Sequence, residues 1–78
     1  MSPTVLRERG YRVVIYFNDH DPPHVHVKKD HAEARVQILP KVELIDQHGF
    51  NNRAIKTVLG IVSENHDLLV ETWNSIHG

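Results

Sequence analysis

HVHVKKDHAEARVQ, residues 24–37, is the stretch of sequence that decides the fold. Apolar and polar residues alternate on both sides of Asp30-His31, and this pattern predicts a β-hairpin with a two-residue turn. In that register Lys28 lies opposite Glu33, a favourable cross-strand pair. A shift by one residue would mix the two faces, so the register is strongly specified. One face is apolar (Val25, Val27, Ala34, Val36), and the other is polar (His24, His26, Lys28, Glu33, Arg35, Gln37).

An earlier hairpin is predicted over residues 4–9 and 11–17, because both segments are rich in β-branched and aromatic residues and Gly10 separates them. The second segment is apolar on both faces, which favours a central position in the sheet. Residues 18–23 form a loop whose two prolines keep the chain extended. After Pro40, only a short extended piece is expected around Val42 and Leu44. The sheet therefore has about four antiparallel strands in two consecutive hairpins.

The C-terminal part of the chain is predicted to be helical. Asn51 is a good N-cap, and Phe50 before it can pack against Ile55. We predict one long helix over residues 52–76 that covers the apolar face of the sheet, with a break near residues 63–66 as the alternative. The chain is thus a single α+β domain over residues 1–78. The apolar residues with helical spacing are Ile55, Val58, Leu59, Val62, Leu69, Trp73 and Ile76.

Composition limits the classes of protein to which the chain can belong. Its 78 residues include 9 Lys and Arg against 10 Asp and Glu, and a net charge of -1 excludes a strongly basic nucleic-acid-binding protein. The absence of cysteine excludes disulfides and thiolate metal sites. No apolar run has the length of a signal peptide or a membrane span, so we expect a cytoplasmic protein. A core this small often needs a partner, either another protein or a second copy of the chain.

Histidine is the residue type that most strongly suggests a functional site. The chain has 7 histidines, and His24 and His26 lie on one face of the predicted strand, about 6.5–7 Å apart. Tyr16, Lys28 and Arg35 are expected to share this polar face. The loop of Asp19, His20 and Asp21 is expected to approach its edge.

Three interpretations of this face compete. In the first, it is a solvated sheet face with structural histidines, the usual state of an antiparallel sheet. In the second, His24, His26 and Tyr16 are catalytic, with the histidines transferring protons while Lys28 or Arg35 holds a phosphate or a partner. Such a site would suffice for a metal-independent ribonuclease, and no cofactor is expected. In the third, a metal ion is bound by His24, His26 and a loop residue, either His20 or Asp21.

Other residues carry weaker signals. Trp73 is expected in the core, although a role as an anchor for a partner is the alternative so near the C-terminus. His66 is expected to be half-buried or to cap a helix. No phosphate-binding glycine loop, nucleophile elbow or paired-carboxylate motif is present.

The sequence resembles a small bacterial family catalogued as domain of unknown function four-one-six-zero (DUF4160). The resemblance spans nearly the whole chain, and its most specific part is Asp21-Pro22-Pro23-His24-Val25-His26-Val27. It also includes Ser2-Pro3-Thr4-Val5, Gly10-Tyr11, Glu33-Ala34, Gly49-Phe50 and Glu64-Asn65-His66-Asp67-Leu68-Leu69 with Trp73. Relatives commonly have a glycine where this chain has His31, and because histidine tolerates positive φ less well, a longer turn is expected there.

The resemblance implies a function but no catalytic residues. Members of the family are often encoded beside a second short gene, in a pairing that resembles a toxin–antitoxin module. This implies a small protein partner and an RNA-directed activity. Our leading hypothesis is therefore a component of such a two-gene module, with the toxin role favoured; if the chain is an enzyme, the expected reaction is RNA cleavage. The alternative is a non-catalytic module that binds protein or DNA, and a histidine-based metal-binding domain is the third hypothesis.

Overall fold

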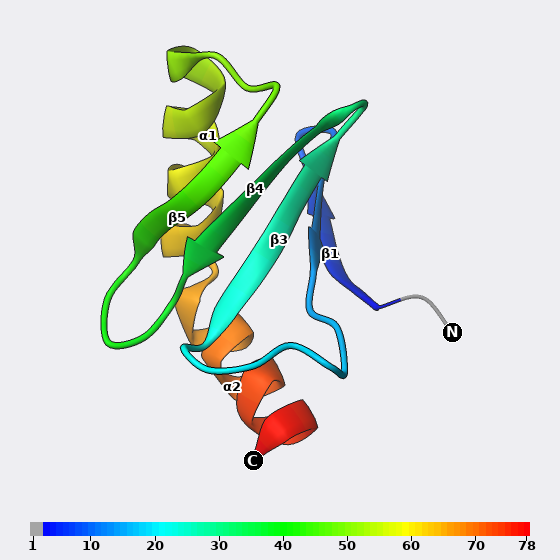
Figure 1. Ribbon diagram of the computed structural model, residues 1–78, viewed down its shortest axis with the longest axis vertical. Helices are drawn as coiled ribbons and strands as arrows, with labels where there is room; N and C mark the ends of the chain where they lie inside the picture. The colour runs from blue at the N-terminus through cyan, green and yellow to red at the C-terminus, as the bar shows by residue number, and fades with distance from the viewer. Residues whose placement is uncertain (1–2) are drawn as a thin grey trace.

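The computed structural model describes residues 3–78 as a five-stranded antiparallel sheet with two helices on one side (Figure 1). The strands follow one another in space in the order of the sequence. The predicted α+β class is therefore confirmed. The strands are β1 (Thr4–Glu8), β2 (Tyr11–Val14), β3 (His24–Lys29), β4 (Ala32–Gln37) and β5 (Glu43–His48), and the helices are α1 (Asn52–Glu64) and α2 (His66–His77). Met1 and Ser2, which begin the motif Ser2-Pro3-Thr4-Val5, lie outside the described residues.

The central hairpin of β3 and β4 has the predicted register throughout, from the pair His24 and Gln37 to the pair Lys29 and Ala32. Lys28 Nζ lies 3.9 Å from Glu33 Oε1, as the cross-strand pairing requires. The longer turn expected from His31 is wrong. The turn keeps two residues, because Asp30 takes the positive φ of 55° and aspartate tolerates this conformation better than most residues.

The sheet has one strand more than predicted. The expected short piece around Val42 and Leu44 is the six-residue strand β5, which pairs with β4. It is an edge strand that buries little, and even Ile45 is 41% exposed. A strand with one neighbour and one weakly covered face needs few apolar residues, so its hydrophobic alternation is weak.

The second strand is shorter than the predicted residues 11–17, because β2 ends at Val14. Ile15 is still buried, and its N–H donates to the carbonyl of Pro3 at 3.2 Å. Tyr16 therefore belongs to the connection between β2 and β3 rather than to a strand. The predicted turn at Arg9-Gly10 is present, and both residues have positive φ, 53° and 82°.

The prediction of one continuous helix is wrong, and the alternative break near residues 63–66 is what the structure shows. Asn65 leaves the helical conformation, with φ -111° and ψ 19°. Its side-chain Nδ2 donates to Glu8 Oε2 at 3.0 Å, and the next residue, His66, bonds through Nε2 to the carbonyl of Ile38 at 2.7 Å. These two contacts with the sheet side of the molecule account for the break. The N-cap at Asn51 is confirmed, since its side chain accepts from the Ala54 N–H at 2.8 Å.

The core lies between the sheet and the helices. Its fully buried members come from the predicted apolar face of the central hairpin, from β2 and from both helices, and Trp73 belongs to it as predicted. Among the residues that the structure describes, neither helix is long and apolar enough to cross a membrane. The fully buried residues at its centre include Val25, Val27, Ala34, Val36, Val58, Ile61, Val62 and Leu69.

Candidate functional site

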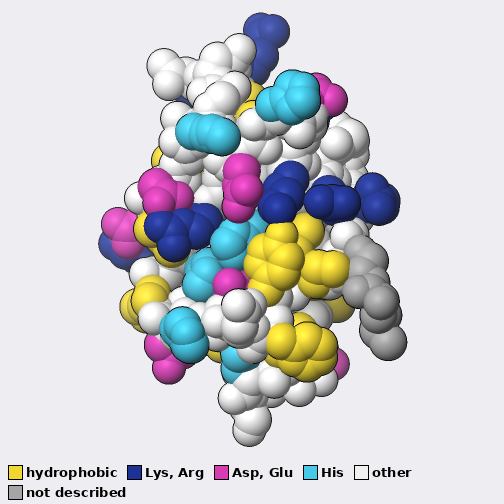
Figure 2. All heavy atoms as spheres, turned by 45° about the vertical axis from the view of Figure 1, so that its right-hand side comes forward, with side chains coloured by type: hydrophobic (Ala, Val, Ile, Leu, Met, Phe, Trp, Pro, Cys, Tyr) yellow, Lys and Arg dark blue, Asp and Glu magenta, His cyan; other side chains and the backbone are white. Residues whose placement is uncertain are grey.

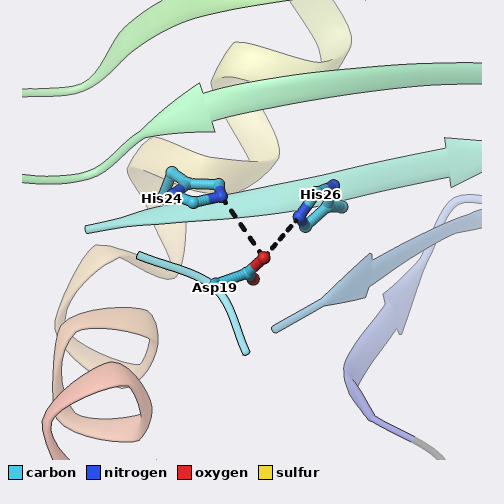
Figure 3. A group of neighbouring side chains, drawn as sticks. All are labelled: Asp19, His24 and His26. Atoms are coloured by element: carbon cyan, nitrogen blue, oxygen red, sulfur yellow. Dashed lines mark hydrogen bonds and ion pairs between the residues drawn. The ribbon is translucent and has the colours of Figure 1, made fainter. Parts of the chain in front are cut away.

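Three side chains converge at the start of β3, on the side of the sheet away from the helix α1 (Figure 3). Asp19 Oδ1 lies 3.2 Å from His26 Nε2 and 3.6 Å from His24 Nε2. One ligand atom from each residue lies within 4.8 Å of the others. Alternation along β3 puts both histidines on one face, as predicted, and the loop between β2 and β3 brings the carboxylate to them.

The other ring nitrogen of each histidine is also held. His24 Nδ1 lies 2.9 Å from the carbonyl oxygen of Pro22, and His26 Nδ1 lies 3.0 Å from Glu33 Oε2. A carbonyl oxygen and a carboxylate can only accept, so each Nδ1 donates. When the ring of His26 is doubly protonated, its Nε2 also donates to Asp19 Oδ1; when both rings are neutral, both Nε2 lone pairs face that oxygen and are open to a cation.

Asp19 is held from its other side by the backbone. Its Oδ2 accepts from the N–H of Tyr16 at 3.0 Å. Burial alone would raise the pKa of the Asp19 carboxyl. The hydrogen bonds from Tyr16 N–H and from His26, together with the charges of His26 and His24, outweigh burial and lower the pKa below its ordinary value. Asp19 is thus a carboxylate at neutral pH.

The cluster is enclosed rather than solvated, which corrects the interpretation of an open polar face. The side chains of Asp19, His24 and His26 are only 11%, 9% and 12% exposed. The Trp73 ring of α2 lies 5.6 Å from the His24 ring, and the Tyr16 ring meets His26 edge-on at 4.9 Å. The loop between β2 and β3 and the helix α2 therefore cover the part of the face that carries the two histidines.

Tyr16 and Lys28 form a pair next to the cluster. Lys28 Nζ donates to the Tyr16 hydroxyl at 2.6 Å, and the same ammonium group lies 3.9 Å from Glu33 Oε1. Both residues were predicted for the site, and both border it. Lys28 keeps donors free for an anion, because an ammonium group has three and the tyrosine takes one.

Two further predicted residues are placed differently from the expectation. Arg35 lies opposite His26 in the sheet, but its guanidinium forms a bidentate pair with Asp46 on β5. His20 and Asp21, the loop residues predicted as alternative third metal ligands, are exposed and do not belong to the convergent group. Asp19 from the same loop converges on the histidines instead.

A row of cations crosses the open part of the same face. Arg7 pairs with Arg12 across β1 and β2, and Arg12 pairs with Lys28 across β2 and β3, so all three project to one side. They line a shared hollow, and Figure 2 shows dark-blue side chains in a row beside the histidines. Within residues 3–78, neither arginine forms an ion pair. Sequence analysis missed Arg7 and Arg12, although pairing the first hairpin around Arg9-Gly10 would have aligned them.

Comparison with known proteins identifies the family of the chain but assigns no activity to it. A family model described as a domain of unknown function (DUF4160) matches residues 10–74. The match covers most of the chain, so the protein belongs to this family, as the resemblance indicated. No curated protein and no solved structure matches it.

Proposed function

We propose that the protein is the RNA-directed component of a toxin–antitoxin-like pair, and that it binds single-stranded RNA through the row of Arg7, Arg12 and Lys28. The observation that carries the proposal is this row. Like charges directly opposite each other destabilise a sheet, and within residues 3–78 neither arginine forms an ion pair, although Asp30 lines the same hollow. A bound phosphate backbone would relieve that repulsion.

The size of the row favours a single strand over duplex DNA. Proteins that bind duplex DNA commonly contact six to ten phosphates. Three cations on a chain of net charge -1 fall short of that number, but they suit a short contact with one strand. Figure 2 shows that the row adjoins the histidine side chains. A phosphate held by Lys28 would therefore lie near the enclosed cluster, where we place the reaction with RNA.

A second surface supports the proposed protein partner. Phe17 is 86% exposed, and it borders an apolar hollow beside β1, which is an edge strand of the sheet. Exposed apolar patches next to an open strand edge are typical of surfaces that accept a segment of another chain. We assign this surface to the product of the neighbouring gene. The apolar residues that line the hollow are Pro3, Val5, Ile15, Phe17, Leu68 and Ile76.

RNA binding is tested by fluorescence anisotropy with a labelled single-stranded RNA at several salt concentrations. Replacing Arg12 with Gln should weaken binding about equally for all sequences and reduce the salt slope by about one. Arg53→Gln is the matched control, because Arg53 is exposed on α1, away from the row. No measurable binding by the unaltered protein, or equal losses in both variants, would contradict the proposal.

The role in a two-gene module is tested in cells. Expression of the chain alone should slow growth, and expression together with the neighbouring gene should restore it. Arg7→Gln combined with Arg12→Gln should relieve the inhibition without preventing co-purification with the partner, because the row and the Phe17 hollow are separate surfaces. Equal growth in all cases, with no complex on co-purification, would refute the module.

A further inference from the structure

We propose that Asp19, His24 and His26 bind one divalent first-row transition-metal ion, with Asp19 Oδ1 and the two Nε2 atoms as ligands. The site goes beyond the proposed RNA binding and does not depend on it. The metal would occupy the point on which the three side chains converge in Figure 3.

Two of the three distances between the ligand atoms match those of a metal site, and the third, between the two histidine nitrogens, is at most 4.8 Å. Zinc–nitrogen and zinc–oxygen bonds of about 2.0–2.2 Å at tetrahedral angles place two ligand atoms about 3.4 Å apart. Asp19 Oδ1 lies 3.2 Å from one Nε2 and 3.6 Å from the other. The side chains therefore need little movement to close around an ion.

The groups that form hydrogen bonds with the three ligand side chains are also typical of a metal site. Histidines that bind a metal through one nitrogen usually donate from the other to a carbonyl or a carboxylate, which fixes the orientation of the ring. His24 does this with the carbonyl of Pro22, and His26 does it with Glu33. Asp19 is oriented in the same way, because its Oδ2 accepts from the Tyr16 N–H.

A network of hydrogen bonds alone accounts for the arrangement less well. A doubly protonated His26 could donate to both Glu33 and Asp19. The contact of His24 Nε2 with Asp19 is 3.6 Å, however, which is too long for a hydrogen bond. His24 Nε2 would then have no hydrogen-bond partner within the described residues, only the charge of Asp19 at 3.6 Å. A cation between the three atoms provides a partner for each of them.

The donor set limits the kind of ion. Two imidazoles and one carboxylate suit zinc, cobalt, nickel and iron, whereas magnesium prefers oxygen ligands. Three protein ligands leave at least one position for water or another molecule, as in catalytic rather than structural sites.

The test is a titration of the metal-free protein, without a histidine tag, with Co²⁺ followed by its visible absorption. One equivalent should bind, zinc should displace it, and magnesium at the same concentration should not. A saturating excess of zinc, about 100 times the dissociation constant, should raise the melting temperature by about 10–20 °C. Binding of less than one equivalent, or a melting temperature that zinc does not change, would overturn the proposal.

Variants locate the ion. Asp19→Asn and His26→Gln should each weaken cobalt binding at least about 100-fold, and Glu33→Ala, which removes the group behind His26, about tenfold. His20→Ala is the matched control, since His20 lies in the same loop but is exposed. Circular dichroism verifies that each variant is folded before titration. Equal cobalt affinity in Asp19→Asn and in the control would overturn the metal site. Loss of RNA binding with intact cobalt binding would support the metal site as a separate property of the cluster.

Discussion

Asp19 Oδ1 lies 3.2 Å from His26 Nε2, and this contact fastens the loop between β2 and β3 to the polar side of β3. The same carboxylate accepts the N–H of Tyr16, so one side chain closes the loop on itself and also anchors it to the sheet. The enclosure of the histidine cluster therefore depends on Asp19.

We expect Asp19→Ala to destabilise the fold by about 2–3 kcal/mol in the presence of a chelator. The substitution removes the acceptor of the Tyr16 N–H and leaves two mostly buried imidazoles without their carboxylate partner, and each such loss costs about 1–3 kcal/mol. Urea unfolding followed by circular dichroism measures the change. Asp21→Ala is the control, because Asp21 is exposed, and it should change stability by less than about 0.5 kcal/mol. Equal effects of the two substitutions would show that Asp19 does not anchor the loop.

Two glycines are expected to respond in opposite ways to alanine. At Gly49, where φ is 91°, an added Cβ would lie 2.9 Å from the Cβ of Ala32, so Gly49→Ala should destabilise the protein by about 2 kcal/mol or more. Gly60 lies inside α1, and its nearest neighbour would be the end of the Glu64 side chain at 3.9 Å. Gly60→Ala should therefore stabilise the protein by up to about 1 kcal/mol. Thermal unfolding of the two variants side by side measures both signs, and a stabilising Gly49→Ala would contradict the close packing.

The central hairpin could be predicted from the sequence because every residue in it constrains the register. A shift by one position would have exposed Val25 and Val27 together, so only one pairing buries the apolar residues. The same alternation placed His24 and His26 on one face. For β5 no such constraint exists, since an edge strand with polar residues folds against β4 through backbone hydrogen bonds that leave little mark on the sequence.

The rest of the site could not be predicted because it depends on tertiary contacts. Asp19, His20 and Asp21 are adjacent and offer similar chemistry, and only the folded loop selects Asp19 for the cluster. Likewise, nothing local indicates that Arg35 pairs with Asp46, because the partner comes from the strand that was not fully predicted. The break at Asn65 also follows from contacts with distant residues, Glu8 above all.

The apolar hollow gives a prediction for the protein partner. Phe17→Ser should weaken co-purification with the proposed protein partner at least about tenfold, because a large exposed aromatic side chain is typical of the residues that dominate an interface. The stability of the isolated protein should not fall, since Phe17 is 86% exposed. Ile45→Ser, at an apolar position 41% exposed on the opposite edge strand, is the control for general surface hydrophobicity. If the complex tolerates Phe17→Ser but not Ile45→Ser, the partner binds at β5 rather than at the Phe17 hollow.

The ion pair between Arg35 and Asp46 decides whether Arg35 can hold a phosphate. The hydrogen bond and the charge of Arg35 lower the pKa of Asp46 below its ordinary value, so the pair is ionised at neutral pH and is lost only as the pH falls through that lowered pKa. Arg35→Gln should therefore leave RNA affinity nearly unchanged and raise the pKa of Asp46 toward its ordinary value, which a titration followed by nuclear magnetic resonance measures. Asp46→Asn should release the guanidinium and remove one negative charge, which should raise RNA affinity about threefold at low salt. A large loss of RNA binding in Arg35→Gln would instead show that the arginine leaves Asp46 for the phosphate, as the sequence analysis predicted.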